Sequence, residues 1–176
     1  METYKNSANN FTKVLLVVYA GILCWILLFK LGVHFSYMNE RSVNLVPFYD
    51  IVNNNGEGGM AEMLLNVLIF LPPGIYIGLL YTQWTYGKKV LLLFLTSLAF
   101  ECIQFVCKTG AFDVTDIVTN TTGAAIGLYI FKAIEKLFNN SMRAQQCINI
   151  LAAAGTIVLL ILLTLLKMGM LPVRYQ

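Results

Sequence analysis

Five long apolar runs constrain this chain more than any other feature, and they lie near residues 14–33, 63–81, 89–107, 116–138 and 148–168. A helix needs about 20 mainly apolar residues to cross the hydrocarbon core of a bilayer. Water is absent there, so each spanning segment must satisfy its own backbone hydrogen bonds as a helix. The chain is therefore predicted to be an all-α membrane protein, a single domain over residues 1–176 that forms a bundle of about five transmembrane helices.

The composition favours the same fold class. The chain is 58% hydrophobic and 12% charged, with a mean hydropathy of +0.71, whereas a soluble domain carries about 25% charged residues. A scattered net charge of +3 gives no basic face for nucleic acid. The four cysteines lack zinc-type spacing and are interpreted as buried, reduced apolar residues, so no metal site and no cofactor is expected; they are Cys24, Cys102, Cys107 and Cys147.

The distribution of Lys and Arg predicts the orientation. With the N-terminus in the cytoplasm, seven basic residues fall inside and five outside, and five spans then place the C-terminus outside. The inner set is Lys5, Lys13, Lys88, Lys89, Lys132, Lys136 and Arg143, and the outer set is Lys30, Arg41, Lys108, Lys167 and Arg174. The loop after the first run is apolar over residues 43–49 and contains Pro47, so it is expected to be interfacial or re-entrant.

Ionisable side chains within the third and fourth runs mark a candidate site, because a charge at the bilayer centre costs a few kcal/mol. Glu101 and Gln104 are three residues apart, so they share one face of the third helix. The fourth run carries a stripe at spacings of three, four, three and four, namely Asp113, Asp116, Asn120, Gly123 and Gly127. Its two glycines predict close approach of a neighbouring helix.

Two further residues are expected to complete this candidate site. Asn66 lies at the outer end of the second run, and Lys30 lies in the outer part of the first. Lys30 either snorkels to the interface or supplies the counter-charge for Glu101 or Asp116. The fifth run has almost no polar side chains and is expected to be peripheral.

Two interpretations of the polar residues remain open. In the structural one, Asp113 caps the fourth helix and the other side chains only hold helices together, at about 0.6 kcal/mol for each hydrogen bond. In the functional one, the carboxylates and amides form a polar pocket that opens to the cell exterior. Asp113 alone fits capping well, but capping does not explain Asn120, Glu101 or Gln104.

Four ordered segments resemble the VanZ family. They are NLVPF at residues 44–48, which contains Asn44, NVLIFLPPG at 66–74, FECIQF at 100–105, and FDVTD at 112–116 with Asn120, Gly123 and Gly127 after it. Four elements in order, over roughly residues 30–130, are more specific than any one of them. Ala111 departs from the pattern, because many members carry an Arg there, and neutralisation of the aspartates would fall to Lys108 or Lys30.

The resemblance implies a multi-pass protein of the bacterial plasma membrane that lowers susceptibility to teicoplanin-type lipoglycopeptides, but it supplies no mechanism. The first hypothesis is a non-enzymatic protein that binds or shields a lipid-linked envelope component, such as a cell-wall precursor, or the glycopeptide antibiotic itself. The alternative is a membrane enzyme or flippase that acts on an envelope lipid through Glu101 and Asp116. No catalytic residue is assigned, because the sequence shows no nucleophile and base pair. Membrane lipids are expected partners. A second copy of the chain, which would form a homodimer, is a further candidate partner.

Overall fold

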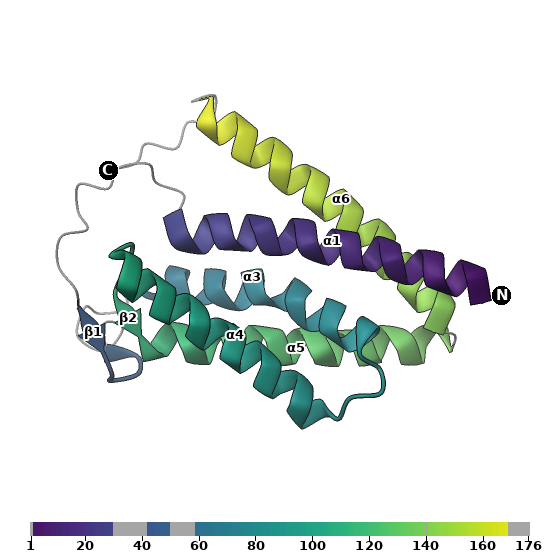
Figure 1. The fold of residues 1–176 in the computed structure, drawn as a ribbon, viewed down its shortest axis with the longest axis horizontal. Helices are drawn as coiled ribbons and strands as arrows, with labels where there is room; N and C mark the ends of the chain where they lie inside the picture. The colour runs from purple at the N-terminus through teal and green to yellow at the C-terminus, as the bar shows by residue number, and fades with distance from the viewer. Residues whose placement is uncertain (1, 30–41, 50–58, 140, 169–176) are drawn as a thin grey trace.

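The computed structural model describes residues 2–29, 42–49, 59–139 and 141–168. These residues form long helices and two short strands (Figure 1) in the order α1 Glu2–Phe29, β1 Val43–Asn44, α3 Gly59–Leu80, α4 Tyr86–Cys107, β2 Phe112–Asp113, α5 Val114–Phe138 and α6 Ser141–Lys167. Five of the described helices are long and apolar enough to cross a membrane, as the sequence predicts. How they are oriented in a membrane stays a prediction.

The first helix begins earlier than the apolar pattern predicts. Its expected range was 14–33, but α1 begins at Glu2 and its apolar span is Ala8–Leu27, while residues 30–33 lie outside the described part. The polar residues before the apolar run are helical because α6 packs along them. Thr12 is fully buried there, and its hydroxyl donates a 2.9 Å hydrogen bond to Oδ1 of Asn149.

Helices α3 and α5 pack closely because glycines line their contact. A Cβ added to Gly123 would overlap the carbonyl oxygen of Val67, and one added to Gly127 would overlap that of Leu71. Gly74 of α3 lies equally close to the backbone of α5. Only residues without a side chain permit this approach, which is the role that the spacing of Gly123 and Gly127 predicts.

A tyrosine of α1 compensates for the two prolines inside α3. Pro73 has no N–H group, so the carbonyl of Ile69, four residues earlier, loses its helical donor. The Tyr19 hydroxyl donates a 2.8 Å hydrogen bond to that carbonyl. A side chain from a neighbouring helix therefore satisfies a backbone acceptor that would otherwise face hydrocarbon.

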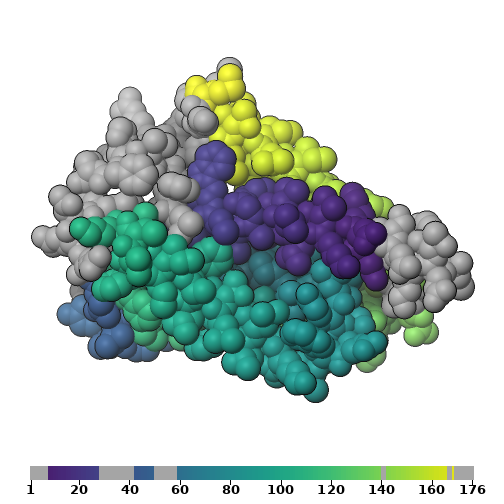
Figure 2. Space-filling model, viewed as in Figure 1, coloured from purple at the N-terminus to yellow at the C-terminus, as the bar shows by residue number. Residues whose placement is uncertain are grey.

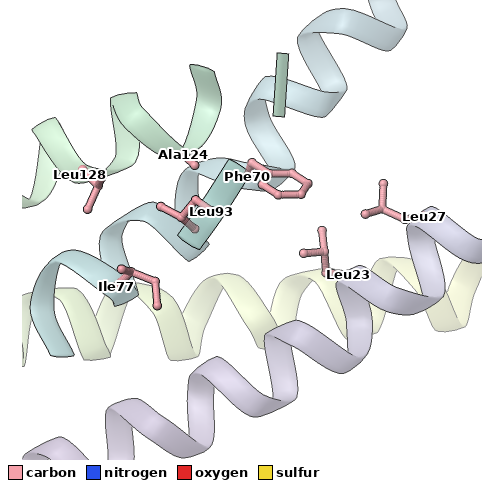
Figure 3. Close-up of a cluster of buried hydrophobic side chains, with 7 residues drawn as sticks. All are labelled: Leu23, Leu27, Phe70, Ile77, Leu93, Ala124 and Leu128. Carbon is pink, nitrogen blue, oxygen red and sulfur yellow. The ribbon is translucent and has the colours of Figure 1, made fainter. Parts of the chain in front are cut away.

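The main hydrophobic core joins four helices (Figure 3). It consists of Leu23 and Leu27 from α1, Phe70 and Ile77 from α3, Leu93 from α4, and Ala124 and Leu128 from α5. Helix α6 contributes no residue to this cluster and forms the upper edge of the molecule in Figure 2, beyond α1. Its span is 17% buried, against 44% for α3 and α5, which agrees with the expected peripheral position.

Two of the cysteines contradict the expectation of burial. Cys102 and Cys107 are exposed on α4, while Cys24 and Cys147 are half-buried, and all four are free thiols. Glu101 and Gln104 face inward on α4, so Cys102, one position after Glu101, lies on the outward side of the helix, while Cys107 is the last residue of α4. In a membrane protein, an apolar residue on that outer face meets lipid instead of a protein core.

The bundle has two chemically different ends (Figure 1). Strands β1 and β2 lie at one end, which we call the strand end, together with the starts of α3 and α5. The opposite end, which we call the lysine end, carries the start of α1, the turn between α3 and α4, and the end of α5. Four lysines of the inner set flank this turn or lie in the last turns of α5, namely Lys88, Lys89, Lys132 and Lys136.

Candidate functional site

The strand end is organised by a short parallel pairing between β1 and β2. Val43 pairs with Phe112, and Asn44 pairs with Asp113. The Phe112 N–H donates a 3.1 Å hydrogen bond to the carbonyl of Ser42. The segment before α3 is thereby fixed against the first residues of α5, which brings two of the family-like sequence segments into contact.

The described part of the loop after α1 continues as a constrained turn. Oδ1 of Asn44 accepts a 3.2 Å hydrogen bond from the Val46 N–H. Phe48 has a φ of 63°, a left-handed conformation that costs a bulky residue roughly 1–2 kcal/mol. Its N–H donates a 3.0 Å bond to the Thr115 hydroxyl, which anchors the turn to α5. Leu45 and Val46 are exposed, and their interfacial or re-entrant position stays a prediction.

Asp113 connects three parts of the strand end. Its Oδ1 accepts a 2.6 Å hydrogen bond from the Thr115 N–H, so it is the N-cap of α5. Its Oδ2 accepts a 3.1 Å bond from the Asn44 side chain. Its own N–H donates a 3.0 Å bond to Oε2 of Glu101 in α4. The capping interpretation of Asp113 is therefore correct, and the cap is also part of a larger polar arrangement.

A second carboxylate connects α5 to α3. Oδ1 of Asp116 accepts a 2.7 Å hydrogen bond from the amide of Asn66, which is buried. One turn later, Thr119 donates its hydroxyl to the backbone carbonyls of Thr115 and Asp116, at 2.9 and 3.2 Å. Asp116 thus has a short charge-assisted contact at the packed face between the two helices.

Toward the strand end, the inward face of α4 carries three buried polar side chains, Ser97, Glu101 and Gln104, with exposed fractions of 0, 2 and 3%. The amide of Asn120 in α5, itself 1% exposed, donates a 3.0 Å hydrogen bond to the Ser97 hydroxyl. The Gln104 amide donates a 3.0 Å bond to the carbonyl of Leu27. That carbonyl lies in the last described turn of α1.

Two buried acceptors of this site have no hydrogen-bond partner in the described part of the chain. They are Oε1 of Gln104 and Oδ1 of Asn120. For Gln104 the amide orientation follows from its neighbour, because the Leu27 carbonyl can only accept. A buried polar atom without a partner costs about 1–3 kcal/mol. Both atoms are hydrogen-bond acceptors, so they are complementary to a donor such as an amine or a hydroxyl.

The structure brings together seven of the eight predicted binding residues. With Ser97 added, we call this set the polar cluster: Asn44, Asn66, Ser97, Glu101, Gln104, Asp113, Asp116 and Asn120. Lys30 lies outside the described residues. Lys108, considered as a substitute for the missing Arg, is exposed and takes the left-handed position that ends α4, with a φ of 56°.

Sequence reasoning missed two groups of polar residues. Ser97 precedes Glu101 by one helical turn, so the same spacing argument would have included it. The second group joins α1 to α6 at the lysine end, and we call it the amide network: Asn9, Thr12, Gln145 and Asn149. These residues lie at or just beyond the edges of apolar runs, where a polar side chain is usually solvated, so hydropathy did not indicate that they contact one another.

An apolar groove lies beside the polar cluster, between α4 and α5. Its volume is about 530 Å³, and its wall includes Phe94 together with Ile117 and Val118, which directly follow Asp116. Thr121 and Thr122 also line it, but their hydroxyls donate to backbone carbonyls of the same helix. The groove therefore offers an apolar surface, and two of its lining residues follow Asp116 directly in the sequence.

Comparison with known proteins identifies the family. The chain matches the VanZ/LLP1 family over residues 16–139. It belongs to the VanZ/LLP1 family. Protein VanZ of Enterococcus faecium is 34% identical to it over 153 residues, which cover 85% of this chain and 88% of that protein. No solved structure matches the chain significantly.

The VanZ/LLP1 match locates the shared part of the molecule. It contains every residue of the polar cluster and ends at the C-cap of α5, so it leaves out α6. Together with the five candidate spans, membership of the VanZ/LLP1 family identifies the chain as a multi-pass membrane protein. The sequence prediction of the family is confirmed.

Proposed function

We propose that this protein lowers the susceptibility of a bacterium to teicoplanin-type lipoglycopeptides by binding or shielding a lipid-linked molecule at the strand end. The molecule is either a lipid-linked envelope component or the antibiotic itself. In this proposal the protein lies in the plasma membrane with the lysine end in the cytoplasm, following the distribution of basic residues. The polar cluster then faces the outer leaflet, where both molecules are found.

The proposal depends chiefly on the two unpartnered amide oxygens, Gln104 Oε1 and Asn120 Oδ1. Polar atoms buried without partners are uncommon in folded proteins and call for an explanation. Here they accompany the carboxylates of Glu101 and Asp116, which makes the polar cluster rich in acceptors. A ligand with amine or hydroxyl donors would satisfy these acceptors, and amino sugars are of this chemistry.

The groove between α4 and α5 supports a lipid-bearing ligand. It runs along the bundle from Ile117, next to the polar cluster, to Tyr86 near the lysine end. Its wall is apolar and faces the hydrocarbon of a surrounding bilayer. An acyl chain lying in this groove would leave its polar head beside Asp116, so one ligand can use both surfaces.

The alternative of an enzyme or flippase gains no support from the contacts of the carboxylates. Oε2 of Glu101 accepts the backbone N–H of Asp113, and Oδ1 of Asp116 accepts the amide of Asn66. One oxygen of each carboxylate is therefore held by a donor of the protein itself, which a general acid or base does not require. We therefore favour binding over catalysis.

Susceptibility of whole cells tests this proposal. A glycopeptide-susceptible bacterium expressing Glu101→Gln should lose protection against teicoplanin, because the amide keeps the size of Glu101 but removes its negative charge. Thr164→Ala is the matched control, since Thr164 is exposed on α6 and its hydroxyl donates to the Leu160 carbonyl of the same helix. Immunoblots of the membrane fraction must show equal amounts of both variants.

Two results would count against the proposal. Full protection by Glu101→Gln, Asp116→Asn and Asn120→Ala together would remove the polar cluster from the mechanism. Equal protection against a glycopeptide that lacks an acyl chain would show that a lipid chain is not part of the mechanism. The enzyme alternative would be supported if purified protein changed the mass of an envelope lipid and Glu101→Gln abolished that change.

A further inference from the structure

A second cavity lies at the lysine end, at the opposite end of the bundle from the polar cluster. Its volume is about 290 Å³, and the turn between α3 and α4 forms one wall. Helix α5 forms the other wall with Leu128, Phe131 and Lys132. The proposed function does not involve this cavity. We call it the lysine pocket.

Lys89 is the unusual residue of the lysine pocket, because it is a lysine with only 6% of its surface exposed. Its ammonium donates a 3.3 Å hydrogen bond to the carbonyl of Gly78, in the last turn of α3. An ammonium group has three N–H donors. The described residues provide no hydrogen-bond acceptor for the other two N–H donors. Capping the end of α3 would use only one donor, so it does not account for them.

A second lysine adds to the positive charge of the pocket. Lys132 is exposed, and its ammonium lies 5.4 Å from the centre of the Tyr86 ring, over the ring face. Lys89 is close enough to interact electrostatically with both Lys132 and Glu135. The carboxylate of Glu135 offsets one of the two positive charges, so the pocket keeps a net charge of +1 that an anion would neutralise.

The start of α4 provides further donors at the same place. Thr85 caps this 22-residue helix by accepting a 3.4 Å bond from the Lys88 N–H, and Thr85 and Tyr86 line the pocket. The first N–H groups of a helix lack helical partners and carry the positive end of its dipole. A phosphate next to a buried ammonium would meet both sources of positive charge.

The aromatic residues around the pocket place it at the depth of lipid headgroups. Tyr81, Trp84 and Tyr86 are exposed by 39, 42 and 45%, and the rings of Tyr81 and Trp84 are in contact, with centroids 4.6 Å apart. Exposed Trp and Tyr at the end of a spanning helix typically lie at the interface between membrane and water. A pocket at this depth lies beside the phosphates of the lipid headgroups.

We propose that the lysine pocket binds the phosphodiester headgroup of an anionic glycerophospholipid. The phosphate accepts the free donors of Lys89, Lys132 and the first turn of α4, while the acyl chains lie along the apolar helices below. The apolar surface around the pocket favours a membrane lipid over a soluble phosphate. This site is independent of the polar cluster and would anchor the turn between α3 and α4 in the opposite leaflet.

Tryptophan quenching by brominated lipids tests the site directly. The chain has two tryptophans, so a Trp25→Phe background leaves Trp84, in the wall of the pocket, as the sole reporter. Full-length protein in vesicles should be quenched more strongly by brominated phosphatidylglycerol than by equimolar brominated phosphatidylcholine. The preference should fall about five-fold in Lys132→Gln and again in Lys89→Gln, as expected for each lysine near an anionic lipid.

Lys136→Gln is the matched control, because it removes the same charge from an exposed position of α5 that does not line the pocket. An equal loss of preference in this control would reduce the effect to general surface charge and overturn the proposal. So would an unchanged preference in Lys132→Gln, which is exposed and should fold even if Lys89→Gln does not. Displacement of the lipid by a millimolar excess of glycerol 3-phosphate would overturn the choice of a lipid over a soluble phosphate.

Discussion

Polar side chains are buried at both ends of the bundle, but they are arranged differently. In the amide network, Gln145 donates a 2.8 Å bond to Asn9 and a 3.2 Å bond to Thr12, and Thr12 donates to Asn149. All four side chains are neutral, and in the described residues none of their buried side-chain atoms lacks a partner. The polar cluster contains carboxylates and two buried oxygens without partners.

We interpret this difference as that between a structural role and the binding role proposed above. A neutral network with satisfied donors and acceptors holds α1 and α6 together and needs no further explanation. The polar cluster retains unsatisfied acceptors although they reduce stability, which is typical of sites that bind a ligand. We therefore predict that variants at the two ends will change the stability of the protein and its protection against teicoplanin to different extents.

The largest effect is expected at the close contact between α3 and α5, the two helices that carry Asn66, Asp116 and Asn120 of the polar cluster. Gly123→Val would force α3 and α5 apart, because its new side chain overlaps the backbone at Val67. We expect a loss of about 3 kcal/mol or more, together with loss of protection. Thermal unfolding in detergent measures it, with Gly155→Val as control, since nothing lies within 4 Å of a Cβ at that position of α6. Similar unfolding of both variants would contradict the close contact.

A smaller effect is expected in the amide network. Asn149→Leu removes the acceptor of the Thr12 hydroxyl, but that hydroxyl keeps its 2.9 Å contact with the Ala8 carbonyl. We expect a loss of about 0.6 kcal/mol, with an upper bound near 1.7 kcal/mol, and unchanged protection against teicoplanin. Ile150→Ala, at an exposed neighbouring position, serves as the control for both measurements. Loss of protection at normal expression would assign a function to the network as well.

The smallest change in stability is expected at Asn120, where the functional effect should be large. Asn120→Leu removes the hydrogen bond to Ser97 but also removes a buried oxygen without a partner. The two effects oppose each other, so we expect a change of less than about 0.5 kcal/mol, accompanied by loss of protection. The same unfolding and susceptibility assays measure both quantities. A variant that is strongly destabilised yet fully protective would reverse our assignment of the two ends.

Helix spacing was sufficient to predict much of the site. Glu101, Gln104 and Asn120 are all at least 97% buried, as their positions on two helix faces predict. Spacing works here because a charged or amide side chain inside a long apolar run can only turn toward protein. The spacing of Gly123 and Gly127 was informative for a related reason, since small residues permit close packing only where they face another helix.

Hydropathy failed where lipid and protein interior are equally apolar. It did not distinguish Cys102, which is exposed, from Leu93, which is buried in the same helix. It also could not show that Lys89 belongs to the buried face of α4, because a lysine at the edge of an apolar run is normally solvated. These positions depend on which helices are neighbours, and a single sequence does not contain that information.

The hydrogen bond between Tyr19 and the Ile69 carbonyl bears on how the protein is made. When α3 leaves the ribosome and enters the bilayer, its proline pair exposes a carbonyl that hydrocarbon cannot solvate. Helix α1 has been synthesised by then, so the tyrosine is already available to receive the incoming segment. Insertion of α3 is thus coupled to its pairing with α1, and the order of the helices along the chain matches the order in which they are needed.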